Sequence, residues 1–502
     1  MRPLVALVAC TVLALPFSGA CTTERVIVSQ APAPPGDTEE EPRAPTEKEQ
    51  EEETPEEEEP KAPSNPLVVD LGEIAAGVDV PFEIPVGALG FNVTIEGKVS
   101  DFDPDRPYGI ERITAPSGKI VHDDFTPAGG SHPTSFTMFD TIASVSVPQG
   151  EGVPEKLDGT WKLRVGRLGA ASSTLKVKAK VRVQASGDGT FHGGKLDLHV
   201  HVPDGLRVDG TTIRGAEAET NAGLKQRIDT FFAVTSRLLG IERGDVVWHA
   251  ESSRYAEVDT IEKLLEGFSI SRGTKDGTQA FHVLLTNEIS QDGEPFAAGI
   301  SPGIPGAATI FGRAVSGIIV TTTRSAEEDV LTMLHEAGHF FGLNHTTELD
   351  GQAADPLSDT PRCTTIQTSL FSCPDRTNVM FAAGAIEGPV TLSPMQQRVF
   401  RGSPIYKAFV SGSRTMSLDL GEASSARLPV LRRRFRASNG ALSPVERDLS
   451  LGYCGLTRID AHALVQRHGR DAIRQLRAAA ADPDLSPIIR GRARLALKQL
   501  GY

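Results

Sequence analysis

Short alternating segments fill residues 66–186. Phe91–Ile95, Ser144–Val147 and Leu175–Val183 place apolar residues at every second position, and Gly, Pro and Asp separate them. Alternation with a period of two is typical of a strand with one buried face, and many short strands between turns are typical of two packed sheets. The pattern therefore predicts an all-β sandwich.

Strand and helix patterns alternate through residues 187–407. Leu196–Val202 alternates with a period of two, and the amphipathic stretch Ala216–Leu239 predicts a helix. Three later apolar runs predict further strands at Val246–Trp248, Phe281–Leu285 and Gly317–Val320. This order favours an α/β domain with a mixed sheet. His199 and His201 lie on the polar side of the first strand, where we expect solvated or edge histidines without a chemical role.

Two helical patterns, Ile459–Ala481 and Ser486–Leu500, lie within residues 408–502, and Asp482–Asp484 separates them. The pair resembles one HEAT-like helical hairpin. A single repeat of that kind cannot bury a solenoid core by itself. We therefore expect a small all-α segment that packs against the preceding domain.

Residues 1–21 have the layout of a signal peptide. The apolar run Leu4–Leu15 is too short for a spanning helix, and small residues follow it directly before Cys21. That ending resembles a bacterial lipobox, in which the cysteine carries a lipid anchor; ordinary secretion with Cys21 unmodified is the alternative. Thr22 and Thr23 lack the aspartate associated with inner-membrane retention, so we expect the outer membrane or the cell surface.

The charge of the chain is concentrated in one segment. Residues 22–65 are rich in Pro and Glu, which predicts a disordered, self-repelling stalk. Residues 36–61 hold thirteen acidic and three basic side chains, a local charge of −10, so the total of −14 leaves only −4 elsewhere. No clustered basic surface remains, which argues against nucleic acid as a partner.

The segment His335-Glu336-Ala337-Gly338-His339-Phe340-Phe341-Gly342-Leu343-Asn344-His345 carries the chemistry. His335 and His339 are four residues apart, so on a helix both imidazoles project from one face and can share a zinc ion. Gly342 allows the chain to turn so that His345 becomes the third ligand. Three ligands leave one position for water, and Glu336 is placed to act as its general base.

The residues around this motif supply the helix that it needs. Ser325 is a capping residue followed by acids in the first turn, and Val330, Met333 and Leu334 form an apolar face. So many fixed positions in a suitable helix rarely occur by chance. The sequence therefore predicts one catalytic zinc ion.

The extended motif resembles that of the metzincin clan of zinc peptidases, and Met380 is the candidate for the methionine turn beneath the metal. Within that clan, about residues 190–407 resemble the pappalysin family. Five segments carry the resemblance: Ala298–Gly303, Gly338–Thr346, Ser358–Pro361, Asn378–Met380 and Leu392–Arg398.

The resemblance has consequences for the substrate and for catalysis. It implies that a substrate lies extended along an edge strand near Ala297–Ile300. The family often has an aspartate and a tyrosine after the turn methionine, whereas Phe381 and Ala382 stand there in this chain. Oxyanion stabilisation would then fall on zinc and backbone donors. Tyr406 is the one alternative source of a hydroxyl that we consider.

Cysteines and carboxylates suggest two further features. Cys363 and Cys373 can close a short loop in an oxidising compartment, with free thiols as the alternative; by the resemblance, this loop lies between the third ligand and the methionine turn. Asp101–Asp105 has three carboxylates at alternate positions, a spacing that Ca²⁺ can use. Arg106 and Arg112 break the EF-hand pattern, so a solvated turn is favoured over calcium.

Two pieces of the sandwich, Ala115–Gly118 and Leu157–Val165, resemble the jelly-roll P domain found beside subtilisin-like proprotein convertases. The whole sequence predicts an exported bacterial zinc metalloendopeptidase, tethered by lipid, that acts on protein or peptide substrates; it does not indicate an oligomeric state. The alternative is a surface adhesin with a weakly active or vestigial zinc site. Glu336 argues against it, because a structural site fills its fourth position with protein.

Overall fold

The computed structural model describes residues 66–411, with gaps within 102–105, 124–139, 151–152, 168–174, 274–278, 292, 307–309, 349–353, 365–371 and 383–388, and residues 461–502 except 470 and 483–486. The predicted signal peptide, the lipid on Cys21 and the stalk lie outside the described residues. Among the described helices, none has the length and apolar character needed to cross a membrane.

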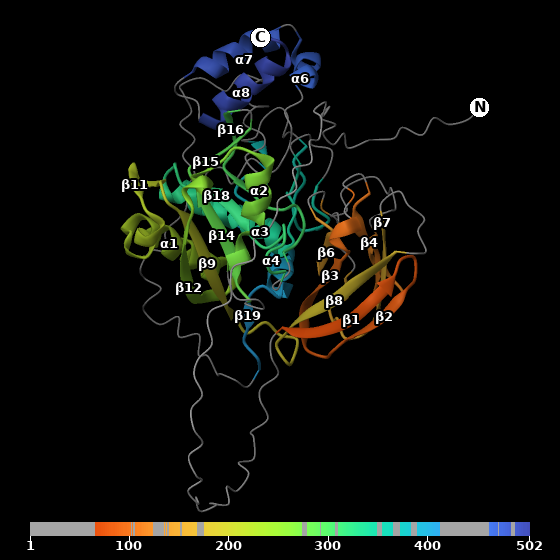
Figure 1. Cartoon of the computed structure of the whole chain (residues 1–502). Helices are drawn as coiled ribbons and strands as arrows, with labels where there is room; N and C mark the ends of the chain where they lie inside the picture. Colours follow the sequence, from red (N-terminus) through yellow and green to blue (C-terminus); the bar gives the residue numbers. More distant parts are fainter. Residues whose placement is uncertain are drawn as a thin grey trace, which may run out of the picture. The chain divides into compact units, whose positions relative to one another are not determined.

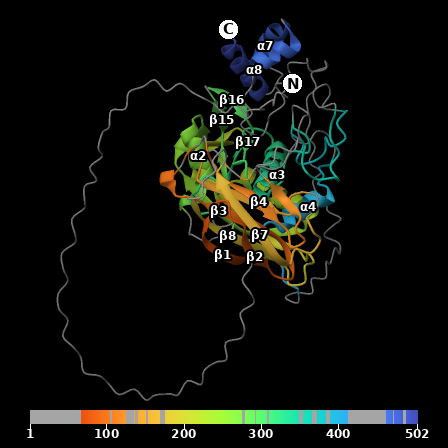
Figure 2. The same ribbon diagram turned by 90° about the vertical axis from the view of Figure 1, so that its right-hand side faces the viewer.

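The first described region consists of eight strands. Figures 1 and 2 show them from perpendicular directions. The strands are β1 (Leu67–Ala75), β2 (Val80–Ile84), β3 (Ala88–Glu96), β4 (Tyr108–Thr114), β5 (Ile120–Asp123), β6 (Ile142–Val147), β7 (Gly159–Arg167) and β8 (Lys176–Ala185). They form two antiparallel four-stranded sheets, ordered β1-β8-β3-β6 and β2-β7-β4-β5. Both sheets contribute to one core, in which the rings of Phe91 and Trp161 meet edge to face at 4.9 Å.

A six-stranded sheet organises the region that follows. Its strands are β9 (Gly194–Pro203), β12 (Ile241–Glu251), β14 (Phe281–Thr286), β17 (Gly299–Ile300), β18 (Ile318–Thr321) and β19 (Lys407–Ala408). The order is β12-β9-β14-β18-β17, with β19 paired to β9. The first four strands are parallel and β17 is antiparallel to β18. The predicted α/β region with a mixed sheet is therefore confirmed.

Helices cover the apolar face of this sheet. The inward residues of β9 and β14 pack with α1 (Ala222–Leu239), α3 (Ala326–Phe341) and α4 (Pro394–Gly402) in one core. The predicted helix from Ala216 was six residues too long, because Asn221 caps α1 and Gly215–Thr220 forms a separate 3₁₀ turn.

The opposite face of the sheet is mixed in character. Leu284 and Ile319 pack against α2 (Ile261–Phe268), beside a small sheet ordered β13-β15-β16. Its strands are β13 (Glu257–Val258), β15 (Glu288–Gln291) and β16 (Glu294–Ala297). His199 and His201 lie on the same face but are only 8% and 1% exposed. The expectation of solvated histidines was wrong, since neighbouring strands bring further histidines against them.

The C-terminal region contains α6 (Ala461–His468), α7 (Asp471–Ala481) and α8 (Pro487–Gln499). The single helix predicted over Ile459–Ala481 is interrupted at Gly469, whose φ of +67° ends α6. Arg494 on α8 forms an ion pair with Glu294 on β16, and Leu495 joins the core beneath β16. The helices thus pack against the small sheet that leads into β17.

The sandwich also contacts the α/β region directly. Gln184 at the end of β8 donates to the backbone carbonyls of Ser403 and Tyr406. The guanidinium of Arg313 forms ion pairs with Asp140 and Glu96. These contacts link strands of the sandwich to the segments around α4 and β18.

The carboxylate of Asp101 accepts a hydrogen bond from the hydroxyl of Tyr108 at 3.3 Å. Asp105, the third carboxylate of the possible calcium site, lies outside the described residues. Asp101 and Asp103 are not among the described groups that could hold a metal ion, so calcium at this turn is not supported.

Candidate metal centre

Helix α3 presents the first part of the motif. Ser325 caps it and forms a reciprocal capping box with Glu328, as predicted. His335 and His339 therefore lie one turn apart on the same helix face. The helix ends at Gly342, whose φ of +110° lies in the left-handed region that favours glycine, and the chain turns back so that His345 approaches the other two.

Each of the three histidines has a hydrogen-bond acceptor behind it. Nδ1 of His335 donates to the carbonyl of Val379 at 2.7 Å, and Nδ1 of His339 donates to the carbonyl of Leu343 at 2.9 Å. Nδ1 of His345 donates to the carboxylate of Glu348 at 3.0 Å. Carbonyl and carboxylate oxygens only accept, so the proton of each neutral ring is on Nδ1.

The other ring nitrogens converge. The three Nε2 atoms lie 3.1–3.2 Å from one another. Because their protons are on Nδ1, the three Nε2 atoms direct their lone pairs at a single point. These lone pairs repel one another unless a cation lies between them. Nitrogen ligands about 2.0–2.1 Å from a tetrahedral zinc ion are about 3.3 Å apart. The donor set therefore fits zinc, and these three histidines can hold a metal ion.

The electrostatics of the centre act in opposite directions on two of its rings. Desolvation, followed by repulsion from His345, lowers the pKa of His339 to about 3, so that ring is neutral at physiological pH. Desolvation also acts on His345, but the charge and hydrogen bond of Glu348 outweigh it and raise the pKa of His345. Glu348 itself keeps a lowered pKa through its interaction with His345, despite its desolvation. A carboxylate behind a ligating histidine fixes the ring and strengthens it as a donor.

Glu336 is fully buried beside the three histidines. A β-carbon added to Gly299 on the edge strand β17 would stand 2.7 Å from Cγ of Glu336 and 2.5 Å from a methyl carbon of Thr332. Only a glycine allows the edge strand to approach α3 so closely. The carboxylate is thereby held between the metal ligands and the edge of the sheet.

Met380 lies under the centre. A β-carbon on Gly338, between the two helical histidines, would be 2.2 Å from the sulfur of Met380, so the thioether packs directly against the helix. Asn378 shapes the turn by accepting from the backbone N–H of Met380 at 2.8 Å. The turn also supplies the Val379 carbonyl to His335. Met380 is therefore an apolar floor and not a ligand in this arrangement.

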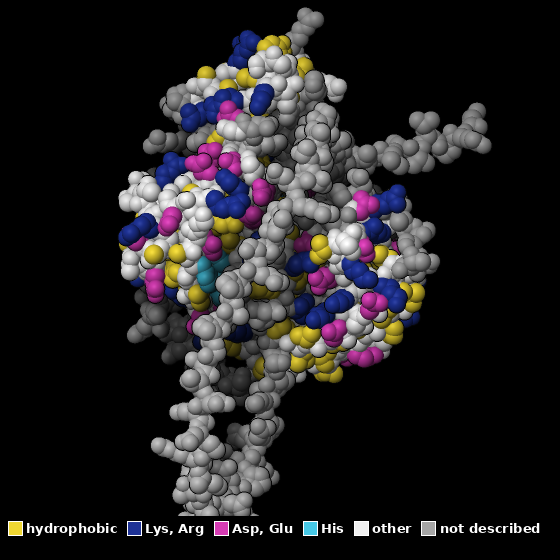
Figure 3. Space-filling model, viewed as in Figure 1, with side chains coloured by type: hydrophobic (Ala, Val, Ile, Leu, Met, Phe, Trp, Pro, Cys, Tyr) yellow, Lys and Arg dark blue, Asp and Glu magenta, His cyan; other side chains and the backbone are white. Residues whose placement is uncertain are grey.

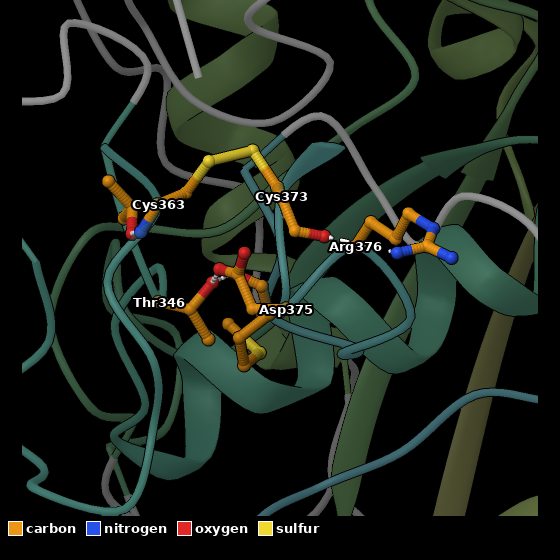
Figure 4. The surroundings of a disulfide bond; sticks show 7 residues. Thr346, Cys363, Cys373, Asp375 and Arg376 are labelled. Carbon is orange, nitrogen blue, oxygen red and sulfur yellow. Dashed lines mark hydrogen bonds between the residues drawn. A yellow bond between two sulfur atoms is a disulfide. The ribbon is translucent and has the colours of Figure 1, made fainter. Parts of the chain in front are cut away.

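A disulfide joins Cys363 to Cys373, the pairing expected from the sequence. Figure 4 shows Thr346, Asp375 and Arg376 around this disulfide. The hydroxyl of Thr346 donates to the buried carboxylate of Asp375, and the backbone N–H of Cys363 donates to the hydroxyl of Thr347 at 2.8 Å. Cys363 and Asp375 are thus tied to the two residues that follow His345.

The two residues after Met380 carry no hydroxyl group. Phe381 and Ala382 are fully buried. Tyr406 does not replace the missing tyrosine, because its hydroxyl donates to the carbonyl of Arg401 in the core near β9. Sequence reasoning missed Glu348, although an acid three residues after the last histidine was a visible sign.

The chain was compared with known proteins. Residues 306–383, which contain the three histidines, Glu336 and Met380, match the model of a peptidase family described as pregnancy-associated plasma protein-A. No curated protein matches the chain in sequence. The resemblance of this segment to metzincin-like zinc metallopeptidases of the pappalysin type is confirmed.

Two solved structures are similar to parts of the chain. Archaemetzincin from Methanopyrus kandleri is 20% identical, with a TM-score of 0.22, over 42% of this chain and 88% of its own length. Metalloproteinase-II from Bacteroides fragilis is 17% identical, with a TM-score of 0.23, over 36% of this chain and 58% of its own length.

Proposed function

We propose that this chain, which is metzincin-like around its histidine motif, is a zinc-dependent endopeptidase that cleaves proteins outside the cytoplasm. The observation that carries the proposal is the convergence of three Nε2 lone pairs beside a buried glutamate. The match of residues 306–383 to a peptidase family supports the same class of reaction.

The side chains divide the work of hydrolysis. His335, His339 and His345 would hold a zinc ion, which when bound would supply a Lewis acid for the scissile carbonyl and lower the pKa of a water molecule. Glu336 accepts the proton of the attacking water and returns it to the leaving amine. Phe381 and Ala382 offer no hydroxyl, so backbone N–H groups share the stabilisation of the oxyanion with the Lewis acid.

The edge of the sheet provides a binding surface for an extended peptide. Gly299–Ile300 forms β17, the last strand of the sheet, and pairs on its inner side with β18. A substrate that adds a strand along the outer side would pass directly over Glu336, because Gly299 lies against that residue. A bond of such a substrate would then lie within reach of Glu336, the proposed general base.

We further propose that the lipid on Cys21 and the stalk over residues 22–65 tether the enzyme at the outer membrane or cell surface. Residues 66–186 would act as a jelly-roll module that supports the catalytic region, an idea supported by the Gln184 and Arg313 contacts. Replacing Cys21 with Ser should move the protein from the membrane fraction to the soluble fraction. Retention of the variant on membranes would count against the lipid anchor.

The decisive experiment measures bound zinc and casein cleavage for the native protein, Glu336→Gln and Glu327→Gln. Glu327 is an exposed acid in the first turn of the same helix, so its variant controls for loss of charge. We expect all three proteins to carry one zinc ion, and Glu336→Gln alone to lose about 10²–10⁴-fold in rate.

The same experiment separates the peptidase from the adhesin alternative. If the native protein binds zinc but cuts neither casein nor a broad peptide library, the site is vestigial and the sandwich becomes the functional part. If Glu336→Gln cuts as fast as the native protein, the general base is a different group.

A further inference from the structure

Four histidines gather on the face of the sheet opposite to α3. His199 and His201 are two residues apart on β9 and so share that face. The pairing of β9 with its parallel neighbours puts His249 of β12 beside His201, and His282 of β14 beside His199. In this view, Figure 3 shows histidine side chains, in cyan, at the surface over the region where Figure 1 labels β9 and β12.

In the two inner rings of this cluster, His201 and His282, shared protons satisfy the nitrogens that face each other and Glu251. Nδ1 of His201 lies 2.8 Å from the carboxylate of Glu251, so it carries the proton and donates it. Its Nε2 then accepts from Nδ1 of His282 at 3.1 Å. His201 and His282 are 1% and 4% exposed. This chain of hydrogen bonds fixes both tautomers and needs no cation.

The other two rings are differently placed. Nδ1 of His199 and Nε2 of His249 are 3.0 Å apart. The ring of His249 stacks on His201 at 4.5 Å with an angle of 12° between the planes, and the ring of His199 lies 4.6 Å from that of His282. The fixed inner pair therefore acts as a support against which the outer pair is held. His249 is half-buried and lies on β12, the edge strand, whereas His199 is only 8% exposed, so the pair is reached from the side of His249.

From this geometry we propose that His199 and His249 chelate a second divalent transition-metal ion, such as Cu²⁺ or Zn²⁺, on the face of the sheet away from the catalytic centre. Two nitrogen atoms 3.0 Å apart can share one ion, as the 3.1–3.2 Å spacing of the catalytic histidines also allows. Imidazole suits these ions, and Cu²⁺ binds more tightly than Zn²⁺ to a given set of nitrogens.

Two further observations shape the proposed site. The pKa values of His199 and His249 are lowered, mainly by desolvation, so both rings are neutral and have a lone pair available at pH 7. In the described part of the chain, the cluster does not supply three ligand atoms close enough for a closed site. Water must complete the coordination, so the ion is exchangeable and binds more weakly than the catalytic zinc.

The test titrates Cu²⁺ into full-length protein that carries one zinc ion per chain and a tag without histidine. Electron paramagnetic resonance then reports how many nitrogens couple to the copper. The variants are His249→Asn and the double variant His199→Asn/His249→Asn. The control is His192→Asn, which removes an exposed imidazole that pairs with Asp188 elsewhere on the chain. Peptidase activity and circular dichroism follow the catalytic centre and the fold.

We expect the native protein and His192→Asn to take up one further equivalent of copper with two coupled nitrogens. His249→Asn should lose the two-nitrogen signal while retaining the catalytic zinc and its activity. A native protein without a two-nitrogen signal overturns the proposal even if the variants fail to fold, and so does a signal that persists in the double variant. Neither result bears on the peptidase, because His199 and His249 lie on the other side of the sheet.

Discussion

The catalytic centre and the histidine cluster on β9, β12 and β14 use the same side chain at nearly the same spacing. Nitrogen atoms approach to 3.1–3.2 Å in the first and to 3.0–3.1 Å in the second. The difference lies in the acceptors behind the rings. All three catalytic rings have an oxygen at Nδ1, whereas in the cluster only His201 has one, from Glu251.

This difference decides what each set can bind. An oxygen acceptor at Nδ1 of every ring holds each proton there, so every Nε2 lone pair faces the centre. Only a cation relieves the repulsion between these lone pairs. Where one ring donates to the next, a proton already relieves the repulsion, as between His201 and His282. The location of the acceptors therefore distinguishes the three-histidine centre from the inner pair, His201 and His282, more sharply than the spacing of the rings does. At the outer pair, His199 and His249, a cation has to displace the proton that the two rings share.

The largest expected effect comes from removing one ring from each set. His345→Asn leaves two catalytic nitrogens and should abolish both tight zinc binding and casein cleavage. His249→Asn should leave both unchanged, because its ring lies on the opposite face of the sheet. Zinc content after dialysis against a weak chelator, together with the cleavage rate, measures the contrast. Loss of tight zinc from His249→Asn would show that the two sets are coupled.

The carboxylates behind the rings give the next largest effect. Glu348→Gln replaces the charged partner of His345 and should weaken zinc binding about 10–100-fold. Glu251→Gln makes the same chemical change behind His201 and should leave the catalytic zinc affinity as it is. Competition with a chromophoric chelator measures both affinities. Equal losses in the two variants would contradict a specific role for Glu348.

A smaller effect is expected from the floor of the catalytic centre. Gly338→Ala adds a β-carbon 2.2 Å from the sulfur of Met380, and overpacking of this kind costs about 1–3 kcal/mol. The better helix propensity of alanine returns about 1 kcal/mol, so the free energy of unfolding should fall by up to about 2 kcal/mol. Denaturant unfolding measures it. The double variant Gly338→Ala/Met380→Ala tests whether the contact with Met380 is the cause. In the Met380→Ala background, the Gly338→Ala change should lower the free energy of unfolding by less than it does in the native protein.

The catalytic set could be predicted because its information is local. His335, His339 and His345 lie within eleven residues, and one helix with a glycine end suffices to bring them together. The strands were predictable for the same reason, since alternation shows in a few residues. Local patterns also explain the errors at helix ends, because the predicted helices ran through Asn221, which caps α1, and through Gly469, which ends α6.

The histidine cluster could not be predicted in this way. Its members come from three parallel strands, and each neighbour is chosen by the register of a crossover connection. His199 and His201 alone are two polar residues on one strand, the usual pattern of a solvated face. Only the pairing of β9 with β12 and β14 shows that other imidazoles cover them.

The smallest expected effect is on stability at acid pH. It tests whether His282 of the histidine cluster stays neutral in the folded protein. Desolvation, with the neighbouring histidines, lowers the pKa of His282 from 6.5 to about 2. The unfolded chain therefore binds a proton below pH 6.5 that the folded chain does not, so this histidine stabilises the fold above pH 6.5 and loses that contribution as the pH falls. Glu251 acts in the opposite direction, because burial raises its pKa.

We expect the metal-free native protein to lose more stability between pH 7 and pH 5 than His282→Asn does, by about 1–2 kcal/mol. Denaturant unfolding at the two pH values, with a chelator present, gives the difference. The catalytic histidines titrate in both proteins and so cancel from the comparison. Parallel losses in the two proteins would mean that His282 takes up its proton in the folded state, and the hydrogen-bonded chain from Glu251 would then not hold it neutral.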